Sequence, residues 1–575
     1  MKLSKEQVDI IEAPLGPMAV TACAGSGKTA TAIRRLIAIR QKMHNSRGRV
    51  VLLSFSNVAV NTFNKGYSEL AAGLPNDANR RRVEVETLDG FFTKHILRPH
   101  AYRTMKANQA AYLVSGFEPF LDGFKYWHEG RPPLPFRDIK IIMMDGDFVF
   151  YSEKKSRIEI LDKVKVSSII DRVGHLGAYT HEIGRYWVYK TLSSQPTILR
   201  ALAARYPQIL VDESQDLGTL HKEILKLLIA EGVQVTLIGD VNQGIYGFAG
   251  ADGEFLDSYE KRAGVTGYKL TRNYRSLPPI IDIANNLCGR HDEADRQGIQ
   301  GGAFFIGYKD SELIKLTDAF KAHIGELRMQ NQDAVILCRG ADRAAVIAGK
   351  TSPPGKGLVK LLAEASLLRD QHNNYLGCFK LVCRAIISLL NNVPHTLSYE
   401  LQRVSNSEEI KGLKRKLWRF SRCVDMGLPS SELIARTDWH SKLLTNVRAL
   451  LEDIEKNYGY KFDGKIGTKL TKNSLLDQPL GSVVSTQAHG LRVETVHQVK
   501  GESIDAVMYV AKKPNIQALL SGTGHEEGRI GYVAITRARN LFWLAVPKSC
   551  IEEFRENLVK AGFQERTDIA PNDPR

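Results

Sequence analysis

One segment of the sequence combines the residue types and the spacing that bind a triphosphate. It reads Ala-Cys-Ala-Gly-Ser-Gly-Lys-Thr, begins at Ala22, and joins an apolar run to a helical pattern. Backbone N–H groups at the start of a helix surround phosphate oxygens when small residues let them approach. The small residues of this loop are Ala24, Gly25, Ser26 and Gly27. Lys28 is expected to meet the β- and γ-phosphates, and Thr29 to bind Mg²⁺.

Two adjacent carboxylates, Asp212 and Glu213, come at the end of a second apolar run. Burying such a pair without a partner is costly, which favours a metal ion and a water molecule beside it. We expect Asp212 to hold Mg²⁺, and Glu213 to orient and deprotonate the attacking water. An acidic pair at a strand end is common by itself. The phosphate loop in the same chain is what favours the catalytic interpretation.

Short apolar runs that alternate with helical patterns must position these motifs. They predict buried strands at 18–22, 50–55, 208–212, 234–239, 334–338, 493–496 and 541–546. Strands that alternate with helices form parallel sheets covered on both faces. The predicted fold class is therefore α/β, with two parallel-sheet core domains, each interrupted by a mostly helical insertion. We place the first core at 1–91 and 191–266 around an insertion at 92–190, and the second core at 267–350 and 490–575 around an insertion at 351–489.

The composition is that of a large globular protein with a basic surface. The 575 residues include 79 Lys and Arg against 63 Asp and Glu, a formal net charge of +16. The positive excess favours a polyanionic partner. Seven scattered cysteines without metal-site spacing predict reduced thiols with packing roles. No apolar run has the length of a membrane helix and the charged N-terminus lacks a signal-peptide pattern, so we expect a cytoplasmic protein with no membrane partner.

Further motifs occur in a fixed order along the chain, at 3–7, 54–59, 212–216, 239–251, 270–276, 496–502 and 532–539. With the phosphate loop they closely resemble the motifs of the UvrD/Rep-like superfamily 1 (SF1A) DNA helicases. The resemblance extends from residue 3 to about residue 547 and covers both cores but neither insertion. It implies two RecA-like cores and an ATP- and Mg²⁺-dependent DNA helicase that moves 3′→5′ on single-stranded DNA.

The resemblance implies roles for individual residues around ATP. Gln7 would read the adenine edge, and Tyr274 would stack on the base. Gln243 would sense the γ-phosphate. Arg275 and Arg537 would reach the same phosphate from the second core as arginine fingers, and such a guanidinium raises the rate about 10³–10⁵-fold. Hydrolysis would therefore be tied to closure of the two cores.

Single-stranded DNA would lie across both cores. Aromatic side chains on the motif loops are expected to stack on successive bases, because stacking requires no particular sequence. The residues expected to contact DNA are Phe55, Asn57, Thr87, Tyr246, Phe248 and His497. A core-packing role for Phe55 and Tyr246 is the alternative.

Three positions depart from the family pattern. Ala249 stands where many relatives carry a second arginine that faces the γ-phosphate. Asp89 stands where histidine is usual, which puts a DNA contact there in doubt. Glu502 lies one place earlier than the usual acidic residue, so its expected contact with the ribose of ATP is in doubt too.

The second insertion contains a strongly basic segment at 411–422. It has no acidic residue, carries Trp418, and has six basic residues, Lys411, Lys414, Arg415, Lys416, Arg419 and Arg422. As a helix it would offer a cationic face to a duplex or a tail. A merely solvated face is the other interpretation.

Two hypotheses about the function stay open at this point. The first is a translocase and helicase that acts on single-stranded DNA and on junctions between single and double strands. The alternative is a nucleotide-gated DNA sensor or regulatory subunit with little unwinding of its own. The compact insertions also resemble those of helicase subunits in antiphage defence systems such as the Gabija pair. That resemblance implies a nuclease partner protein, and the chain itself shows no nuclease constellation.

Overall fold

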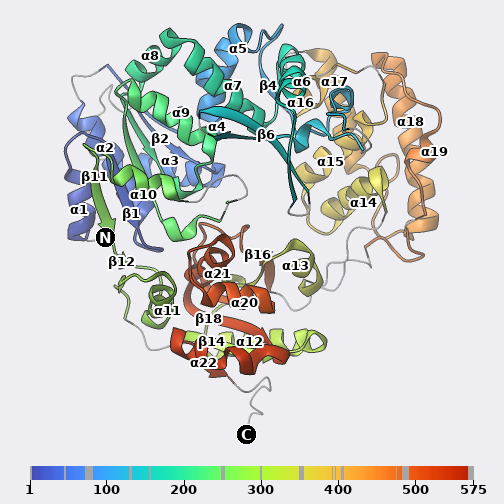
Figure 1. Ribbon diagram of the computed structural model, residues 1–575. Helices are drawn as coiled ribbons and strands as arrows, with labels where there is room; N and C mark the ends of the chain where they lie inside the picture. Colours follow the sequence, from blue (N-terminus) through green and yellow to red (C-terminus); the bar gives the residue numbers. More distant parts are fainter. Residues whose placement is uncertain are drawn as a thin grey trace.

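The structure is a computed structural model in which two parallel sheets form the centres of two core domains (Figure 1). It describes residues 3–43, 47–71, 82–128, 132–144, 146–154, 157–245, 247, 253–297, 301–348, 355–391, 393–394, 396–402, 407–473, 475–481 and 491–566. The α/β fold class is confirmed, with two RecA-like domains and additional helical regions.

The first sheet has six parallel strands in the order β11-β1-β10-β9-β2-β3. Their bounds are β1 (Met18–Ala22), β2 (Val50–Ser54), β3 (Val83–Thr87), β9 (Gln208–Val211), β10 (Gln234–Gly239) and β11 (Thr266–Leu270). Successive side chains point to opposite faces. Val20 and Leu52 therefore pack with α1 (Lys5–Glu12), α2 (Lys28–Lys42) and α3 (Asn57–Ala71), whereas Val51 and Leu53 pack with α9 (Thr219–Ala230) and α10 (Glu254–Glu260).

The second sheet, also parallel, has the order β16-β15-β17-β18-β14-β19. Its strands are β14 (Gly302–Tyr308), β15 (Ala334–Cys338), β16 (Arg492–Thr495), β17 (Ile504–Val510), β18 (Ala538–Pro547) and β19 (Gln564–Arg566). One face, with Phe542, packs on α11 (Pro278–Cys288), α20 (Lys513–Leu520), α21 (Glu526–Arg537) and α22 (Ile551–Ala561). The other, with Trp543, packs on α12 (Leu313–Glu326) and α13 (Ala341–Ile347). A short pair, β12 (Arg272–Asn273) and β13 (Glu293–Ala294), lies between the two sheets in the chain.

The chain leaves the first sheet after β3 and returns to it at β9, through a region that includes the first insertion. Its helices are α4 (Leu88–Phe92), α5 (Arg98–Thr104), α6 (Lys163–His175), α7 (His181–Ser194) and α8 (Pro196–Arg205). The region also holds an antiparallel sheet that the sequence analysis did not anticipate, made of β5 (Lys140–Met144), β6 (Asp147–Lys154) and β7 (Arg157–Ile160). A parallel pair, β4 (Tyr112–Leu113) and β8 (Ala178–Tyr179), completes it.

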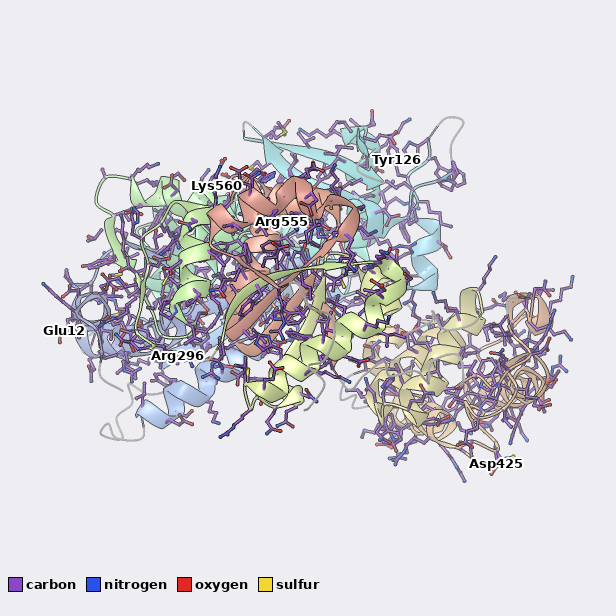
Figure 2. All side chains as sticks on the ribbon, turned by 90° about the horizontal axis from the view of Figure 1, so that it is seen from below. Glu12, Tyr126, Arg296, Asp425, Arg555 and Lys560 are labelled. Atoms are coloured by element: carbon purple, nitrogen blue, oxygen red, sulfur yellow. The ribbon has the colours of Figure 1, made fainter. Side chains whose placement is uncertain are left out.

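The second insertion is helical and has a hydrophobic core of its own. Its helices are α14 (Gly357–Asp370), α15 (Tyr375–Ile387), α16 (Leu397–Leu401), α17 (Glu408–Arg422), α18 (His440–Tyr458) and α19 (Ile466–Lys469). The buried guanidinium of Arg369 donates hydrogen bonds to the carbonyls of Ser421, Leu428 and Pro429 at 2.6–3.3 Å. Figure 2 shows this insertion, marked by Asp425, at the opposite end of the view from Glu12 of the first core.

The seven predicted strands all occur, with ends that differ by at most a few residues. All seven cysteines are free thiols and five of them are buried, as expected for packing roles. None of the helices in the described ranges is long and apolar enough to cross a membrane.

Candidate active site

The phosphate loop lies between β1 and α2, with its glycines in a left-handed backbone conformation. Gly25 has φ +73° and Gly27, the N-cap of α2, has φ +79°. A Cβ atom on Gly25 would lie 2.5 Å from Cβ of Arg275, and one on Gly27 would lie 2.8 Å from Nε2 of Gln7. Both positions therefore require glycine. Lys28 and Thr29 are the first two residues of α2, so their backbone N–H groups lie at its N-terminus.

Gln7 lies against this loop, although its residue number is far from it. It is fully buried, and its Nε2 donates to the backbone oxygen of Ser26 at 3.2 Å. Its Oε1 accepts from the backbone N–H of Ser4 at 3.1 Å, which forms a capping box at the start of α1. The predicted glutamine is thus beside the phosphate loop, and its contact with adenine stays a prediction.

The acidic pair follows β9, which is separated from β1 only by β10 in the sheet. Glu213 has φ +52°, an uncommon conformation for a residue with a side chain. Asp212 is buried, and among the described residues its Oδ1 has no hydrogen-bond partner. An unpartnered buried carboxylate oxygen near Lys28 of the loop suits a divalent cation. The donor set therefore fits the Mg²⁺ that was expected.

The two carboxyls of the pair have opposite proton affinities. Burial and the charge of Glu213 raise the pKa of Asp212 to about 7. Burial also opposes ionisation of Glu213, but the charges of Lys28 and Lys500 outweigh it and lower its pKa to about 2. Gln215 donates a hydrogen bond to the Glu213 carboxylate. Glu213 is therefore held ionised, which is the form that a general base needs.

Gln243 follows β10 and contacts both cores. Its Nε2 donates to Oδ2 of Asp240 at 2.8 Å within the first core. Its Oε1 accepts from Nη2 of Arg537 in the second core at 2.9 Å. In the sheet, β10 lies between β1, which precedes the phosphate loop, and β9, which precedes the acidic pair. Gln243 follows β10. The carboxyl ends of neighbouring parallel strands meet at one edge of a sheet, which is where such folds bind ligands.

The two predicted arginine fingers lie at the same place from the second core. Arg537 is 1% exposed, and its Nη1 donates to the backbone oxygen of Glu502 at 3.3 Å. Arg275 donates from Nη1 to the backbone oxygen of Thr536 at 3.1 Å. Burial and the nearby charge of Arg537 lower the pKa of Arg275 to about 9. An anionic ligand between them would relieve this repulsion.

Tyr274 contacts the phosphate loop, whereas the side chain of Glu502 pairs with a residue of its own core. The backbone N–H of Tyr274 donates to the backbone oxygen of Gly25 at 2.9 Å, so this residue touches the phosphate loop directly. The carboxylate of Glu502 pairs with Arg492 at 2.7 Å, and 40% of its side chain is exposed. The structure therefore places Tyr274 against the phosphate loop, whereas the Glu502 side chain already has a partner on its own core.

Two ion pairs between the cores were not predicted. Lys500 Nζ lies 2.6 Å from both oxygens of Asp216 and also donates to the backbone oxygen of Gln243 at 2.8 Å. Arg290 Nη2 lies 3.0 Å from Oδ1 of Asp240, which is fully buried. Lys500, Asp216 and Asp240 belong to the recognised motifs, but their pairing across the interface is a long-range property. Arg290 lies outside every motif, and no sequence signal marks it.

The residues expected to contact DNA follow other strands of the two sheets. Phe55 follows β2 and Asn57 begins α3, where it is exposed. Thr87 caps α4 by accepting from the backbone N–H of Gly90 at 3.1 Å. His497 lies after β16, with Nε2 3.2 Å from the backbone oxygen of Ile245 of the first core. The other two expected contacts, Tyr246 and Phe248, lie outside the described residues, and so does Ala249, the departure near the γ-phosphate.

Asp89, one of the three departures from the family pattern, lies within a network of one arginine and two histidines. Arg185 donates to both of its carboxylate oxygens, at 3.0 and 2.8 Å. Nδ1 of His181 and Nε2 of His221 lie 3.1 and 3.2 Å away. Burial opposes ionisation, yet these hydrogen bonds hold the pKa of Asp89 well below its usual range. The ring of His221 in turn meets Phe55 edge-on at 5.8 Å. Asp89 thus ties α7 to the loop that carries Phe55.

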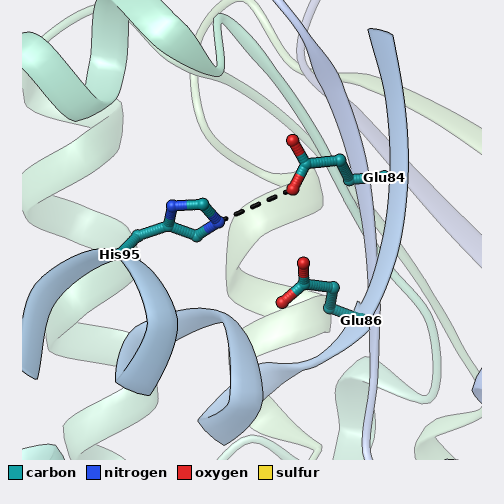
Figure 3. A group of neighbouring side chains, drawn as sticks. All are labelled: Glu84, Glu86 and His95. Carbon is teal, nitrogen blue, oxygen red and sulfur yellow. Dashed lines mark ion pairs between the residues drawn. The ribbon is translucent and has the colours of Figure 1, made fainter. Parts of the chain in front are cut away.

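A second group of titratable side chains lies at β3. Glu84, Glu86 and His95 place potential metal ligands within 4.8 Å of one another, with His95 Nε2 3.6 Å from Glu84 (Figure 3). Arg49 and Lys94 pair with Glu84, and Lys94 also pairs with Glu86. These side chains already supply the positive charge that a metal ion would bring. We therefore regard the group as an ion network that holds β3 in place.

Comparison with known proteins agrees with this geometry. Residues 3–115 and 150–264 match the UvrD/REP helicase N-terminal domain, and residues 308–549 match the UvrD-like helicase C-terminal domain. ATP-dependent DNA helicase UvrD2 of Mycobacterium tuberculosis is 22% identical, over 93% of this chain and 77% of that protein. ATP-dependent DNA helicase Rep of Buchnera aphidicola is 21% identical, over 94% of this chain and 92% of that protein. The two domain models together cover most of the sequence, and the chain belongs to the UvrD/Rep-like superfamily 1 of ATP-dependent DNA helicases.

Proposed function

We propose that this protein is a DNA translocase and helicase that moves 3′→5′ on single-stranded DNA and couples ATP hydrolysis to closure of its two cores. The observation that carries the proposal is the convergence of both cores on Gln243. Its side chain accepts from Arg537 of the second core, and its backbone oxygen accepts from Lys500. A phosphate bound at this place would be shared by both cores.

The proposed chemistry assigns one task to each group. Lys28 and the backbone of the phosphate loop bind the β- and γ-phosphates. Thr29 and Asp212 hold Mg²⁺, which supplies positive charge to the phosphate oxygens. Glu213 orients the water and accepts its proton. Arg275 and Arg537 stabilise the charge that develops on the phosphoryl group.

Movement would follow from the link between this chemistry and the distance between the cores. When the phosphate leaves, Arg275 and Arg537 lose their shared anionic ligand, and the cores separate. The proposed DNA contacts lie on both cores, with Phe55, Asn57 and Thr87 on the first and His497 on the second. Alternate release of these contacts would advance a single strand and open a junction ahead of it. The domain boundaries at residues 91, 190, 266, 350 and 489 belong to the same proposal.

The test is ATPase activity with and without single-stranded DNA, followed by strand displacement from a duplex with a 3′ tail. We expect DNA to stimulate hydrolysis strongly, and displacement to require ATP. A substrate with a 5′ tail is the control for direction. Hydrolysis that is unchanged by DNA would contradict the proposal.

A second candidate is a nucleotide-gated DNA sensor, which includes a regulatory subunit with a nuclease partner in antiphage defence. The observation that favours it is Asp89, which replaces the usual histidine. Its carboxylate already contacts Arg185, His181 and His221. A first core that grips DNA less firmly suits sensing better than processive unwinding. DNA-stimulated ATPase without any strand displacement would favour this candidate.

A further inference from the structure

The basic segment of the second insertion forms the amphipathic helix α17. Ile410, Leu413 and Leu417 are buried in the core of the insertion. Part of the basic face is neutralised, because Lys411 pairs with Glu408 and Lys416 pairs with Asp453. Ion pairs therefore neutralise some of the basic residues of this segment, and its face is not uniformly cationic. Lys414 and Trp418 of this helix line a groove.

The groove consists of two neighbouring cavities, one between the insertions and one lined by the second insertion alone. One, of about 460 Å³, is lined by His181 and Ser115 of the first insertion and by Tyr399 of the second. The other, of about 300 Å³, is lined by Trp418 of α17. Lys380 and Gln402 line both cavities, so the two lie side by side.

The walls of this groove are held together by aromatic and cationic side chains. The ring of Phe117 in the first insertion lies between the guanidinium groups of Arg137, at 4.2 Å, and Arg384 of α15, at 4.0 Å. Arg98 donates to the hydroxyl of Tyr399 at 3.2 Å. Figure 1 shows α16 and α17 beside the first insertion. The two insertions thus form a single surface around the groove.

The charge of the groove is positive. Lys380 is exposed, and it makes no hydrogen bond or ion pair with the described residues. Lys414 lines the second cavity. The acidic residue of the lining, Glu118, already accepts hydrogen bonds from the backbone N–H groups of Ser115 and Gly116, both at 2.8 Å. With Lys380 and Lys414 against Glu118, the formal charge of the lining is positive, which favours an anionic ligand.

The groove also offers apolar and aromatic surface. Trp418 is half-buried and meets Phe379 at 4.8 Å between ring centroids, with Leu376 exposed beside them. Aromatic rings beside lysines bind bases and phosphates of a single strand. A duplex keeps its base faces stacked inside, so it offers none of them to these rings.

We propose that this groove binds an unpaired DNA strand, separate from the strand that crosses the two cores. Lys380 and Lys414 neutralise its phosphates, and Trp418 supplies a surface for a base. The proposal rests on the proposed action at junctions between single and double strands, where one strand is displaced. The groove guides that strand away between the two insertions.

The first test is the charge reversal Lys380→Glu, with Lys465→Glu as a matched control. Lys465 is an exposed lysine of the same insertion, just before α19, and it does not line the groove. Binding of a forked DNA with two unpaired arms is measured by fluorescence anisotropy at several salt concentrations. We expect Lys380→Glu to weaken fork binding about fivefold and to reduce the salt dependence by about one phosphate contact. The control should bind as wild type does.

A short oligonucleotide separates this proposal from the proposed function. An oligonucleotide of about ten nucleotides fills only one site, and its stimulation of the ATPase should be equal in wild type and in Lys380→Glu. If it does not stimulate wild type, the proposed function fails. If it does, and Lys380→Glu binds forks as wild type does, the groove proposal alone is overturned.

Photocrosslinking identifies the occupant directly. Bromodeoxyuridine placed in the displaced arm of the fork should crosslink to a peptide of α15 or α17, and Lys380→Glu should reduce that crosslink. An arm that crosslinks only to the core domains would overturn the proposal. So would polyglutamate that displaces the arm as well as single-stranded DNA does, because the groove would then bind an acidic protein.

Discussion

The cores and the insertions each form an interface, and the two interfaces differ in how they are built. Between the cores, charged side chains are buried: Lys500 and Asp216 are 9% and 4% exposed where they pair. Between the insertions, Phe117 remains 45% exposed between its two arginines, and a cavity of about 460 Å³ lies beside it. The first interface excludes water, and the second leaves room for a ligand.

This difference indicates how much free energy it costs to break contacts at each interface. A buried ion pair is costly to break by removing one partner, because the other charge is left without compensation. Contacts between arginines and an exposed ring are each worth only about 0.5–1 kcal/mol. The core interface is thus suited to a closed state that a ligand stabilises. The insertion interface can open or adjust at little cost.

The largest expected effect is at the nucleotide end of the core interface. Arg275→Ala should lower DNA-stimulated ATP turnover about 10³-fold or more, because it removes a guanidinium from the developing phosphoryl charge. Binding of a fluorescent ATP analogue should change far less than turnover. Arg539→Ala is the control, since the side chain of this nearby arginine is 45% exposed and, within the described ranges, pairs with Asp505 alone, at 3.1 Å. Equal loss in both variants would contradict a catalytic role for Arg275.

The next effect concerns the ion pair between Lys500 and Asp216, one of the two that join the cores. Lys500→Met should destabilise the closed protein by about 3–5 kcal/mol, because Asp216 would be left buried and unpaired. The double variant Lys500→Met/Asp216→Leu should recover part of the loss. Thermal unfolding and limited proteolysis of all three proteins measure this. A double variant less stable than Lys500→Met would show that the pair is not the source of the effect.

A smaller effect, on the pH dependence of unfolding, is expected at His323, which lies outside both interfaces. His323 accepts a hydrogen bond at Nδ1 from Trp543 at 3.1 Å, and burial lowers its pKa to about 4. Because the unfolded chain binds the proton first, stability should fall as the pH decreases from about 6.5 to about 4. His323→Gln retains an acceptor for Trp543 and should reduce the slope of Tm against pH over that range. An unchanged slope would mean that other groups dominate acid unfolding.

The smallest effect is expected at the insertion interface. Phe117→Ala removes both guanidinium contacts and should cost about 1–2 kcal/mol at most. ATP turnover on a short oligonucleotide should stay near that of wild type. Fluorescence energy transfer between dyes on the two insertions should show a broader distance distribution, and Phe117→Tyr should restore it. A large loss of turnover would show that the insertions are coupled more tightly to the cores than their contacts indicate.

The strands and site motifs were predictable wherever local sequence carries the information. β1, β10 and β15 have the predicted ends, because short apolar runs between turn residues mark buried parallel strands. The edge strand β3 was not predicted. All five of its residues are only partly buried, and Glu84 and Glu86 interrupt its apolar pattern. The antiparallel sheet β5-β6-β7 was missed too, because its pairing depends on partners elsewhere in the insertion.

By itself, the sequence marked the candidate nucleotide site. The phosphate loop, Asp212 and Glu213 act through residue type and short spacing after a strand, and such spacing persists in any fold that contains the strand. Only the tertiary structure decided which distant charges meet, such as Lys500 with Asp216, Arg290 with Asp240, and Asp89 with Arg185. The physical reason is that an ion pair depends on a few ångströms between side chains. Strand order and domain docking set that distance, and no local pattern encodes it.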